Sequence, residues 1–413
     1  MKIKFSLITI SCLMLFVSIN ESYAQQKDSQ LVNTPYIDST LYEKVNSLEK
    51  EVAFQKKRES HFMVVGLATM GFVISSNTVN QNGISSTTQT NSMADADRFE
   101  FSPMMLWRHG KKLLIEFEPS WDGNAIGVNW GDISYFVKPG FIVRAGYIVL
   151  PFGIYNKRLA AGWINKLGSD PVGISDSPPG SDFGVEIEGG LPLGGMKWTY
   201  DISLTNGMQL LKDGTIQNAG IADNNQNKTI TGRMSILPFS NSCLEIGASG
   251  LYGNVGDVKS KETSAVSTMY AFDLNFVQKV GPVQINAKGQ YNQVNISTIN
   301  YQNPTDSSNY TFNNQSSSYF SQLSIRPVSA PGILKNFEIA GRYVNYITPA
   351  KSSWGSITNE FNIALDYWLS WRSVIKIVYE SRLVKNNTPI NLGGAPGDWN
   401  RINNIILQYS VQF

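Results

Sequence analysis

The sequence predicts an all-β fold, a transmembrane antiparallel β-barrel of roughly sixteen strands, on three observations. From His61 onward, apolar and polar residues alternate with a period of two, as in strands that have one apolar face. Short connections alternate with long ones rich in Asn, Ser, Gly and Thr, as in a barrel with tight turns at one rim and long loops at the other. Beyond the N-terminus, no run of ~20 apolar residues offers a spanning helix.

Composition supports a barrel and argues against several other classes of protein. Hydrophobic residues make up 42% of the chain and charged residues only 16%, which suits strands whose apolar face is diluted by alternation. The formal net charge is +2, and it falls to +1 without residues 1–24, because Lys2, Lys4 and Glu21 lie there. This balance indicates neither a nucleic-acid partner nor a polybasic membrane anchor.

The first 24 residues are typical of a secretory signal peptide. Lys2 and Lys4 precede an apolar run from Phe5 to Ile19, and Ser22-Tyr23-Ala24 ends in the small residue that a signal peptidase requires. We therefore expect cleavage after Ala24. Cys243 is then the only cysteine, so no intramolecular disulfide can form.

Residues 25–60 are predicted to form a polar linker and a short helix from about residue 40 to 58. Thr40 and Glu43 have the spacing of a capping box. An apolar seam follows at steps of three and four, formed by Leu41, Val45, Leu48 and Val52. Two heptads are too short to be stable alone, so the seam needs a partner. It predicts either a periplasmic coiled coil between protomers or an amphipathic helix that is packed on its own barrel or frayed.

Residues 61–413 form the predicted barrel. Its strands are expected near residues 61–76, 98–108, 111–121, 126–138, 140–150, 182–190, 195–206, 228–238, 242–253, 265–279, 282–296, 318–328, 336–348, 355–369, 372–384 and 401–413. Side chains then sort by face: Phe272 and Leu274 point one way, and Asp273 and Asn275 the other. Charges fall on the inner wall, and a barrel of this circumference encloses water, since side chains cannot fill it.

The last strand, from Arg401 to Phe413, closes the predicted barrel. Its alternation places Ile405, Leu407 and Phe413 on one face, and pairing with the first strand leaves no open edge in lipid. A strand that ends the chain on an aromatic residue resembles the C-terminal signal of Gram-negative outer-membrane barrels. That resemblance implies that Phe413 is read by the barrel-assembly machinery.

The connection from Leu150 to Ser181 is long, yet it carries bulky apolar and cationic residues, which need something to pack against. Gly146 followed by Pro151-Phe152-Gly153 resembles the Gly-x-x-x-x-Pro-Phe-Gly region of phosphate-selective porins and related trimeric porins with an N-terminal coiled coil. The resemblance covers the signal, the helix, the strand pattern and this loop. It implies an outer-membrane homotrimer in which the third loop folds into the pore and forms the constriction.

The pore constriction is expected to combine loop bases with wall charges of both signs. The candidates are Lys157, Arg158, Lys166, Arg144, Glu116, Glu118 and Asp132. Phosphate selectivity is not carried over, because inward carboxylates, which include Glu186, Glu188 and Asp201, interrupt an arginine ladder. We expect passive diffusion of small hydrophilic solutes, selected by size first and charge second, with a small preference for anions from the loop bases.

Other functions fit the sequence less well. Barrel enzymes use histidine with Asp, Asn or Ser, but His61 and His109 lie at a strand start and in a short turn. These histidines and one cysteine have no metal-ligand spacing, and no cofactor is expected. A hydrophobic-compound transporter with residues 25–60 as an internal hatch, and a structural or adhesive barrel, remain the alternatives.

Overall fold

The chain folds into a closed antiparallel β-barrel of 16 strands, as the sequence predicts. The computed structural model describes residues 60–93, 99–175, 178, 180–218, 228–257, 263–303 and 305–413. The expected signal peptide and the helix with Leu41, Val45, Leu48 and Val52 therefore lie outside the described residues. The barrel strands are β1 (Ser60–Gln81), β3 (Glu100–His109), β4 (Leu113–Trp121), β5 (Ile126–Lys138), β6 (Phe141–Val149), β7 (Ser181–Leu193), β8 (Met196–Thr205), β11 (Thr229–Leu237), β12 (Leu244–Asn254), β13 (Val266–Val280), β14 (Val283–Ile296), β17 (Asn314–Arg326), β18 (Phe337–Ile347), β19 (Ser356–Ser370), β20 (Ser373–Asn386) and β21 (Trp399–Gln412).

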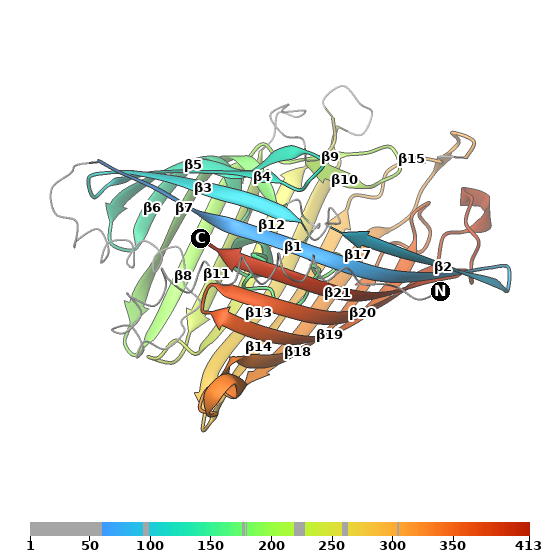
Figure 1. The fold of residues 1–413 in the computed structure, drawn as a ribbon. Coiled ribbons are helices and arrows are strands. Elements are labelled where there is room, and N and C mark those ends of the chain that lie inside the picture. The colour runs from blue at the N-terminus through green and yellow to red at the C-terminus, as the bar shows by residue number, and fades with distance from the viewer. Residues whose placement is uncertain are drawn as a thin grey trace. The chain divides into compact units, whose positions relative to one another are not determined.

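The first and last strands close the barrel. β1 pairs antiparallel with β21 from Leu67 opposite Gln412 to Asn80 opposite Trp399, and the two strands lie side by side in Figure 1. Beyond the end of β21, the backbone of Phe413 exchanges two hydrogen bonds of 3.0 Å with Gly66. The Phe413 ring also stacks on Phe101 of β3, with ring centroids 5.7 Å apart. The terminal aromatic residue thus ties β21 to both β1 and β3.

The connection after the first predicted strand contains a long hairpin, which the sequence analysis did not predict. β1 continues to Gln81 and pairs with β2 (Ile84–Met93). Asn82 and Gly83 form the turn, with φ angles of 52° and 80°. Both central residues of a tight hairpin turn need positive φ, which Asn-Gly supplies at low cost. β2 pairs with Phe72–Gln81 of β1, which follow the part of β1 that pairs with β3.

The two rims differ as predicted. At one rim the strands are joined by tight turns, several of which contain a glycine with positive φ, such as Gly110, Gly140 and Gly281. The other, long-loop rim holds two small hairpins, β9 (Met208–Leu210) with β10 (Ile216–Asn218) and β15 (Tyr301–Gln302) with β16 (Asn309–Tyr310). Short helical turns span Tyr155–Leu159, Gly332–Asn336 and Ile390–Leu392. Within the described part of the chain, none of the helical segments is long and apolar enough to cross a membrane.

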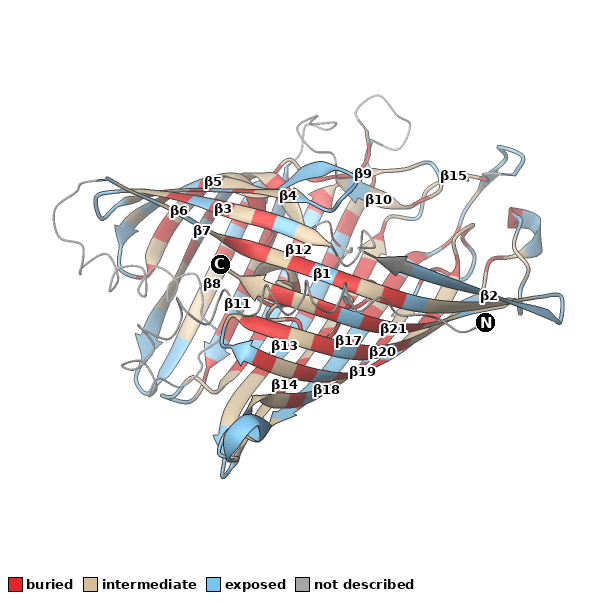
Figure 2. Cartoon of the chain, in the orientation of Figure 1, coloured by how far each residue is buried: buried red, intermediate tan, exposed pale blue. Residues whose placement is uncertain are grey.

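Burial alternates along the strands, which Figure 2 shows as bands of colour. On β13, Phe272 is 58% exposed, whereas its neighbour Asp273 is 4% exposed. The outward positions are apolar and the inward ones mostly polar, which confirms the predicted assignment of faces. The inner wall is therefore the place to look for a functional site.

Candidate functional site

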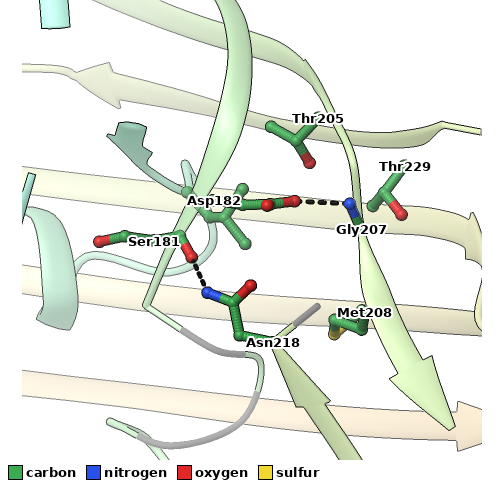
Figure 3. Close-up of a pocket in the computed structure, with 8 residues that line it drawn as sticks. Ser181, Asp182, Thr205, Gly207, Met208, Asn218 and Thr229 are labelled. Atoms are coloured by element: carbon green, nitrogen blue, oxygen red, sulfur yellow. Dashed lines mark hydrogen bonds between the residues drawn. The ribbon is translucent and has the colours of Figure 1, made fainter. Parts of the chain in front are cut away.

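The candidate site is the β6–β7 loop, residues 150–180, together with the inner wall that it contacts. The loop leaves and rejoins the wall at one point, where the Leu150 N–H donates to the Gly180 carbonyl over 2.9 Å. Beside this point, an Asp182 carboxylate oxygen accepts from the Gly207 N–H over 2.6 Å, in a pocket that Met208 also lines (Figure 3). Both ends of the loop are thus fixed to the long-loop rim.

An apolar row on the inner wall contacts Leu167 of the loop. Most inward positions are polar, but five apolar ones are paired directly across neighbouring strands. They run from β18 through β19, β20 and β21 to β1, in the order Ala340, Ala364, Val378, Ile406 and Val73. Leu167 of the loop packs against this row and is 1% exposed. These departures from the alternation therefore mark the position at which the loop contacts the wall.

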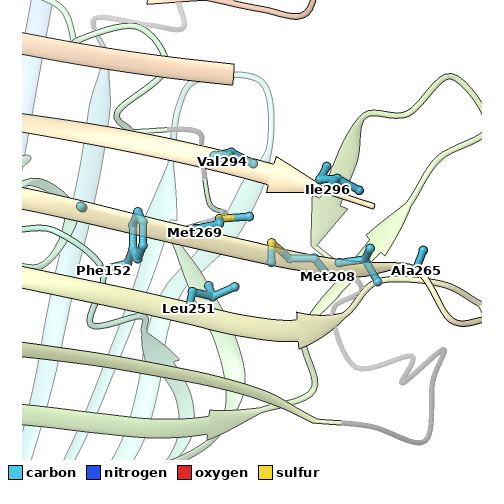
Figure 4. Close-up of a cluster of buried hydrophobic side chains, with 9 residues drawn as sticks. Phe152, Met208, Leu251, Ala265, Met269, Val294 and Ile296 are labelled. Atoms are coloured by element: carbon cyan, nitrogen blue, oxygen red, sulfur yellow. The ribbon is translucent and has the colours of Figure 1, made fainter. Parts of the chain in front are cut away.

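Two further apolar clusters form between the inner wall and other residues of the loop. Phe152 packs among inward side chains such as Leu251 of β12 and Met269 of β13 (Figure 4). Ile154, Tyr155, Leu159 and Ile174 pack against Phe320 of β17 and Val344 of β18. These apolar residues of the loop are thus buried against the wall, as its composition led us to expect, whereas Trp163 is only partly buried.

Backbone hydrogen bonds fix the turn between these clusters. The N–H groups of Ile154 and Tyr155 both donate to the side-chain carbonyl of Gln290, each over 2.9 Å. The Gly153 N–H donates to the Ser249 hydroxyl over 2.9 Å. Gly153 has a φ of 65°, and a Cβ atom there would overlap the Gln290 amide. Only glycine fits this position without strain.

Lys157 lies among three carboxylates of the neighbouring wall. Its Nζ lies 2.5 Å from Glu186, 3.0 Å from Glu188 and 3.1 Å from Asp201. Burial alone would lower the pKa of Lys157, but the negative charges of Asp201, Glu186 and Glu188 raise it above the ordinary value. Lys157 therefore stays charged and ties the loop to β7 and β8.

Arg158 begins a chain of ion pairs on the next part of the wall. Its Nη1 lies 2.7 Å from both oxygens of Glu245 on β12. Glu245 also accepts from Arg233, over 3.0 Å, and Arg233 lies 2.6 Å from Asp273. With the loop cation included, this network contains two bases, Arg158 and Arg233, and two acids, Glu245 and Asp273.

Further polar contacts join the loop to the other side of the barrel. Lys166 lies 3.4 Å from Glu338 and stacks over the Trp368 ring, with its Nζ 4.1 Å from the centroid. Lys376 of β20 donates to the backbone carbonyls of Gly162 and Asn165, the latter over 2.6 Å. A wall lysine therefore donates hydrogen bonds to two backbone carbonyls of the loop.

The loop crosses the barrel interior, because its contacts lie on opposite walls. Strands pair in the order β8, β11, β12, β13, β14, β17, β18, β19, β20, so β20 is eight steps from β8 in a barrel of 16. Lys157 binds at β7 and β8, and Lys376 binds the loop from β20. The loop is thus anchored on both sides of the barrel.

The predicted wall residues gather beside the Lys157 carboxylates. Arg144 lies 2.6 Å from Glu116, 3.4 Å from Asp132 and 3.7 Å from Glu188, so it links the two groups. Glu118 accepts from Asn129 over 3.0 Å. Arg144 thus pairs with wall carboxylates, one of which, Glu188, also pairs with Lys157.

Several partners of the loop were not among the predicted site residues. The alternation along the strands placed Glu186, Glu188 and Asp201 on the inner wall. Their convergence on Lys157, however, depends on strand register. Glu245, Gln290 and Glu338 were missed for the same reason. The predicted histidine positions hold: His109 ends β3, and its Nδ1 lies 2.9 Å from the Ser60 hydroxyl at the short-turn rim, away from the loop.

Comparison with known proteins gives the fold a context. No protein-family model and no curated protein matches the chain. The anion-selective porin from Comamonas acidovorans is similar in structure, with a TM-score of 0.50 and 13% identity over 86% of this chain and 100% of that chain. The outer-membrane channel DcaP of Acinetobacter baumannii has a TM-score of 0.50 and 10% identity, over 87% and 99% respectively. At such low identity the likeness shows the fold alone: this chain forms a closed barrel similar to those of an outer-membrane porin and an outer-membrane channel.

Proposed function

We propose that this protein is an outer-membrane porin of a Gram-negative bacterium, through which small hydrophilic solutes diffuse passively. The observation that carries the proposal is the β6–β7 loop, anchored to opposite sides of a barrel with a polar inner wall. A barrel of this circumference is too wide for wall side chains to fill. The loop then acts as the constriction, and the space beside it is the path for solutes.

The outer surface supports a location in lipid. Large apolar side chains point outward around the barrel and stay exposed, for example Met234 at 60% and Ile339 at 59%. Each would gain roughly 1.5–3 kcal/mol on leaving water. The closed ladder also leaves no strand edge within the barrel wall, which a membrane core requires. The similarity in fold to outer-membrane proteins agrees with this location.

Targeting and assembly complete the proposal. The signal peptide, cleaved after Ala24, directs the chain across the inner membrane, and Phe413 serves the barrel-assembly machinery. The seam of residues 41–52 joins three protomers as a periplasmic coiled coil. This part of the proposal rests on the sequence pattern and on the resemblance to trimeric porins.

Selection by size comes first and by charge second. Lys157, Arg158 and Lys166 each face a wall carboxylate, so little of their positive charge reaches a passing solute. Inside a narrow aqueous gap, low-dielectric walls still focus what remains of the field. We therefore propose a small preference for anionic solutes and a sharper limit on size.

Conductance in planar bilayers tests the proposal. The purified full-length protein should conduct steadily without any added ligand, and replacing residues 154–174 by a short Gly-Ser linker should raise the conductance. A matched Gly-Ser replacement of residues 305–308, in the turn between β15 and β16, should leave conductance unchanged. A wild-type barrel that conducts no current would refute the porin proposal and favour a hatched transporter or a scaffold.

A further inference from the structure

One inward row of the wall contains a carboxylate without a hydrogen-bond partner. Cross-strand pairing places Glu338 of β18, Asp366 of β19 and Lys376 of β20 next to one another. Asp366 is 0% exposed, and neither of its carboxylate oxygens accepts a hydrogen bond from the residues that the structure describes. Burying such a group without a partner costs free energy, so its position in the wall needs an explanation.

Glu338, the neighbour of Asp366 on one side, is bound by other groups. Its carboxylate accepts from the Ser324 hydroxyl over 2.6 Å and from Trp368 Nε1 over 2.8 Å. The Lys166 ammonium of the loop lies 3.4 Å away. Like charges directly opposite each other in a sheet are destabilising, so Glu338 does not stabilise an ionised Asp366.

Lys376, the neighbour on the other side, is bound by the loop. Its Nζ donates to the backbone carbonyls of Gly162 and Asn165, the latter over 2.6 Å, and to Gln408 Oε1 over 2.9 Å. An ammonium group has three hydrogens, and these three acceptors use all of them. The loop therefore takes up donors that could otherwise bind the carboxylate of Asp366.

Lys376 is long enough to reach Asp366 from its present position in the strand. The Cβ atoms of directly opposite residues in an antiparallel pair are about 4.5–5.5 Å apart. The flexible four-carbon stem of lysine spans that separation by a change of rotamer. When residues 162–165 leave the wall, the ammonium loses two acceptors, and the carboxylate of Asp366 can take their place.

We propose that Lys376 and Asp366 form a two-position switch for the β6–β7 loop. Lys376 binds the loop carbonyls when the loop lies on the wall, and it pairs with Asp366 when this part of the loop is detached. Leu167 and the apolar row favour the first position, because detachment exposes both to water. Asp366 thus raises the frequency of detachment. This switch goes beyond the proposed porin function and does not depend on conduction.

Amide hydrogen exchange of the purified full-length protein in detergent tests the switch. The reporter is the peptide that covers residues 162–169, because its exchange rate follows the population in which this segment is detached. Asp366→Asn removes the charged acceptor of the detached state. It should slow exchange of the reporter about tenfold, which is the lower end of what a hydrogen bond to a charged group contributes.

A second background isolates the pairing with Lys376 from the burial of a charge. In Lys376→Met the ammonium is absent, so adding Asp366→Asn should leave exchange of the reporter unchanged. The matched control is Glu118→Gln on β4, which removes an inward carboxylate that accepts from Asn129 and should not alter the reporter. Exchange in β13 should stay the same in all variants, which shows that global stability has not changed.

Heat-modifiable migration on gels shows that each variant is folded before exchange is measured. The switch is ruled out if Asp366→Asn leaves exchange of residues 162–169 unchanged. It is also ruled out if Asp366→Asn slows exchange equally in the Lys376→Met background, since the effect would then come from the buried charge alone. Conductance separates this result from the porin proposal. A barrel with the expected exchange pattern but no current refutes only the porin, and one that conducts without that pattern refutes only the switch.

Discussion

Gly153→Ala should release the start of the β6–β7 loop while leaving the barrel intact. Alanine at a φ of 65° costs roughly 1–2 kcal/mol. The new methyl group also displaces the Gln290 amide, which accepts two backbone N–H groups over 2.9 Å, each worth about 0.5–1.5 kcal/mol. The sum is roughly 2–5 kcal/mol. At about 1.4 kcal/mol per factor of ten, the released population rises roughly 30-fold or more.

Trypsin provides the assay, because Lys157 and Arg158 lie just after this turn and are shielded by their carboxylate partners. The Gly153→Ala protein in detergent should be cut there at least tenfold faster than the wild type, and its conductance should rise. Gly250→Ala is the matched control, since a Cβ atom on this β12 glycine meets no neighbour. Equal cleavage rates in the two variants would refute the role assigned to the Gln290 contacts.

Three further predictions follow from the site and the fold. Replacing Lys157 and Arg158 by Glu should shift the reversal potential across a potassium chloride gradient toward cation selectivity; unchanged potential and conductance would place both residues outside the solute path. Deleting Phe413 should deplete folded, heat-modifiable protein in the outer membrane, because the deletion removes its backbone bonds and ring stacking; normal folded levels would count against an assembly signal. Changing Leu41 and Leu48 to Asp should weaken association and spare the barrel; a monomeric wild type in light scattering would contradict the coiled coil.

The strands could be predicted because apolar side chains outside and polar side chains inside impose a period of two. The strand expected at residues 126–138 coincides with β5, and the others differ by a few residues at their ends. β2 was missed because Ile84–Met93 is mostly Ser, Thr, Asn and Gln, so it lacks an apolar face. The Asn82-Gly83 dipeptide was the available signal, since that pair favours a two-residue hairpin turn.

The loop could be singled out from sequence as a candidate site, whereas the wall residues that it contacts could not. Its composition identified Lys157, Arg158 and Lys166, because buried cations and apolar residues in a long connection require a surface to contact. The partners depend on register, since a shift of one residue between β7 and β8 would separate Glu188 from Asp201. The local sequence does not specify this register, although the alternation along each strand already placed both carboxylates on the inner wall.

The apolar row on the wall shows how the loop could be positioned from sequence once register is known. Ala340, Ala364, Val378, Ile406 and Val73 each interrupt the polar inward face of a different strand, and singly each is an unremarkable exception. Paired register aligns them into one continuous band.

Polar inward residues flank this apolar band on both sides. The row on one side consists of Glu338, Asp366, Lys376 and Gln408, and the row on the other side consists of Arg342, Asn362, Glu380 and Asn404. An apolar band between two polar ones would be unfavourable in an aqueous pore unless something covers it. Leu167 covers it, and the charged rows on either side bind the backbone of the same segment through Lys376 and Arg342. The wall and the loop are therefore complementary in both apolar and polar groups, which favours one fixed path for the loop across the barrel.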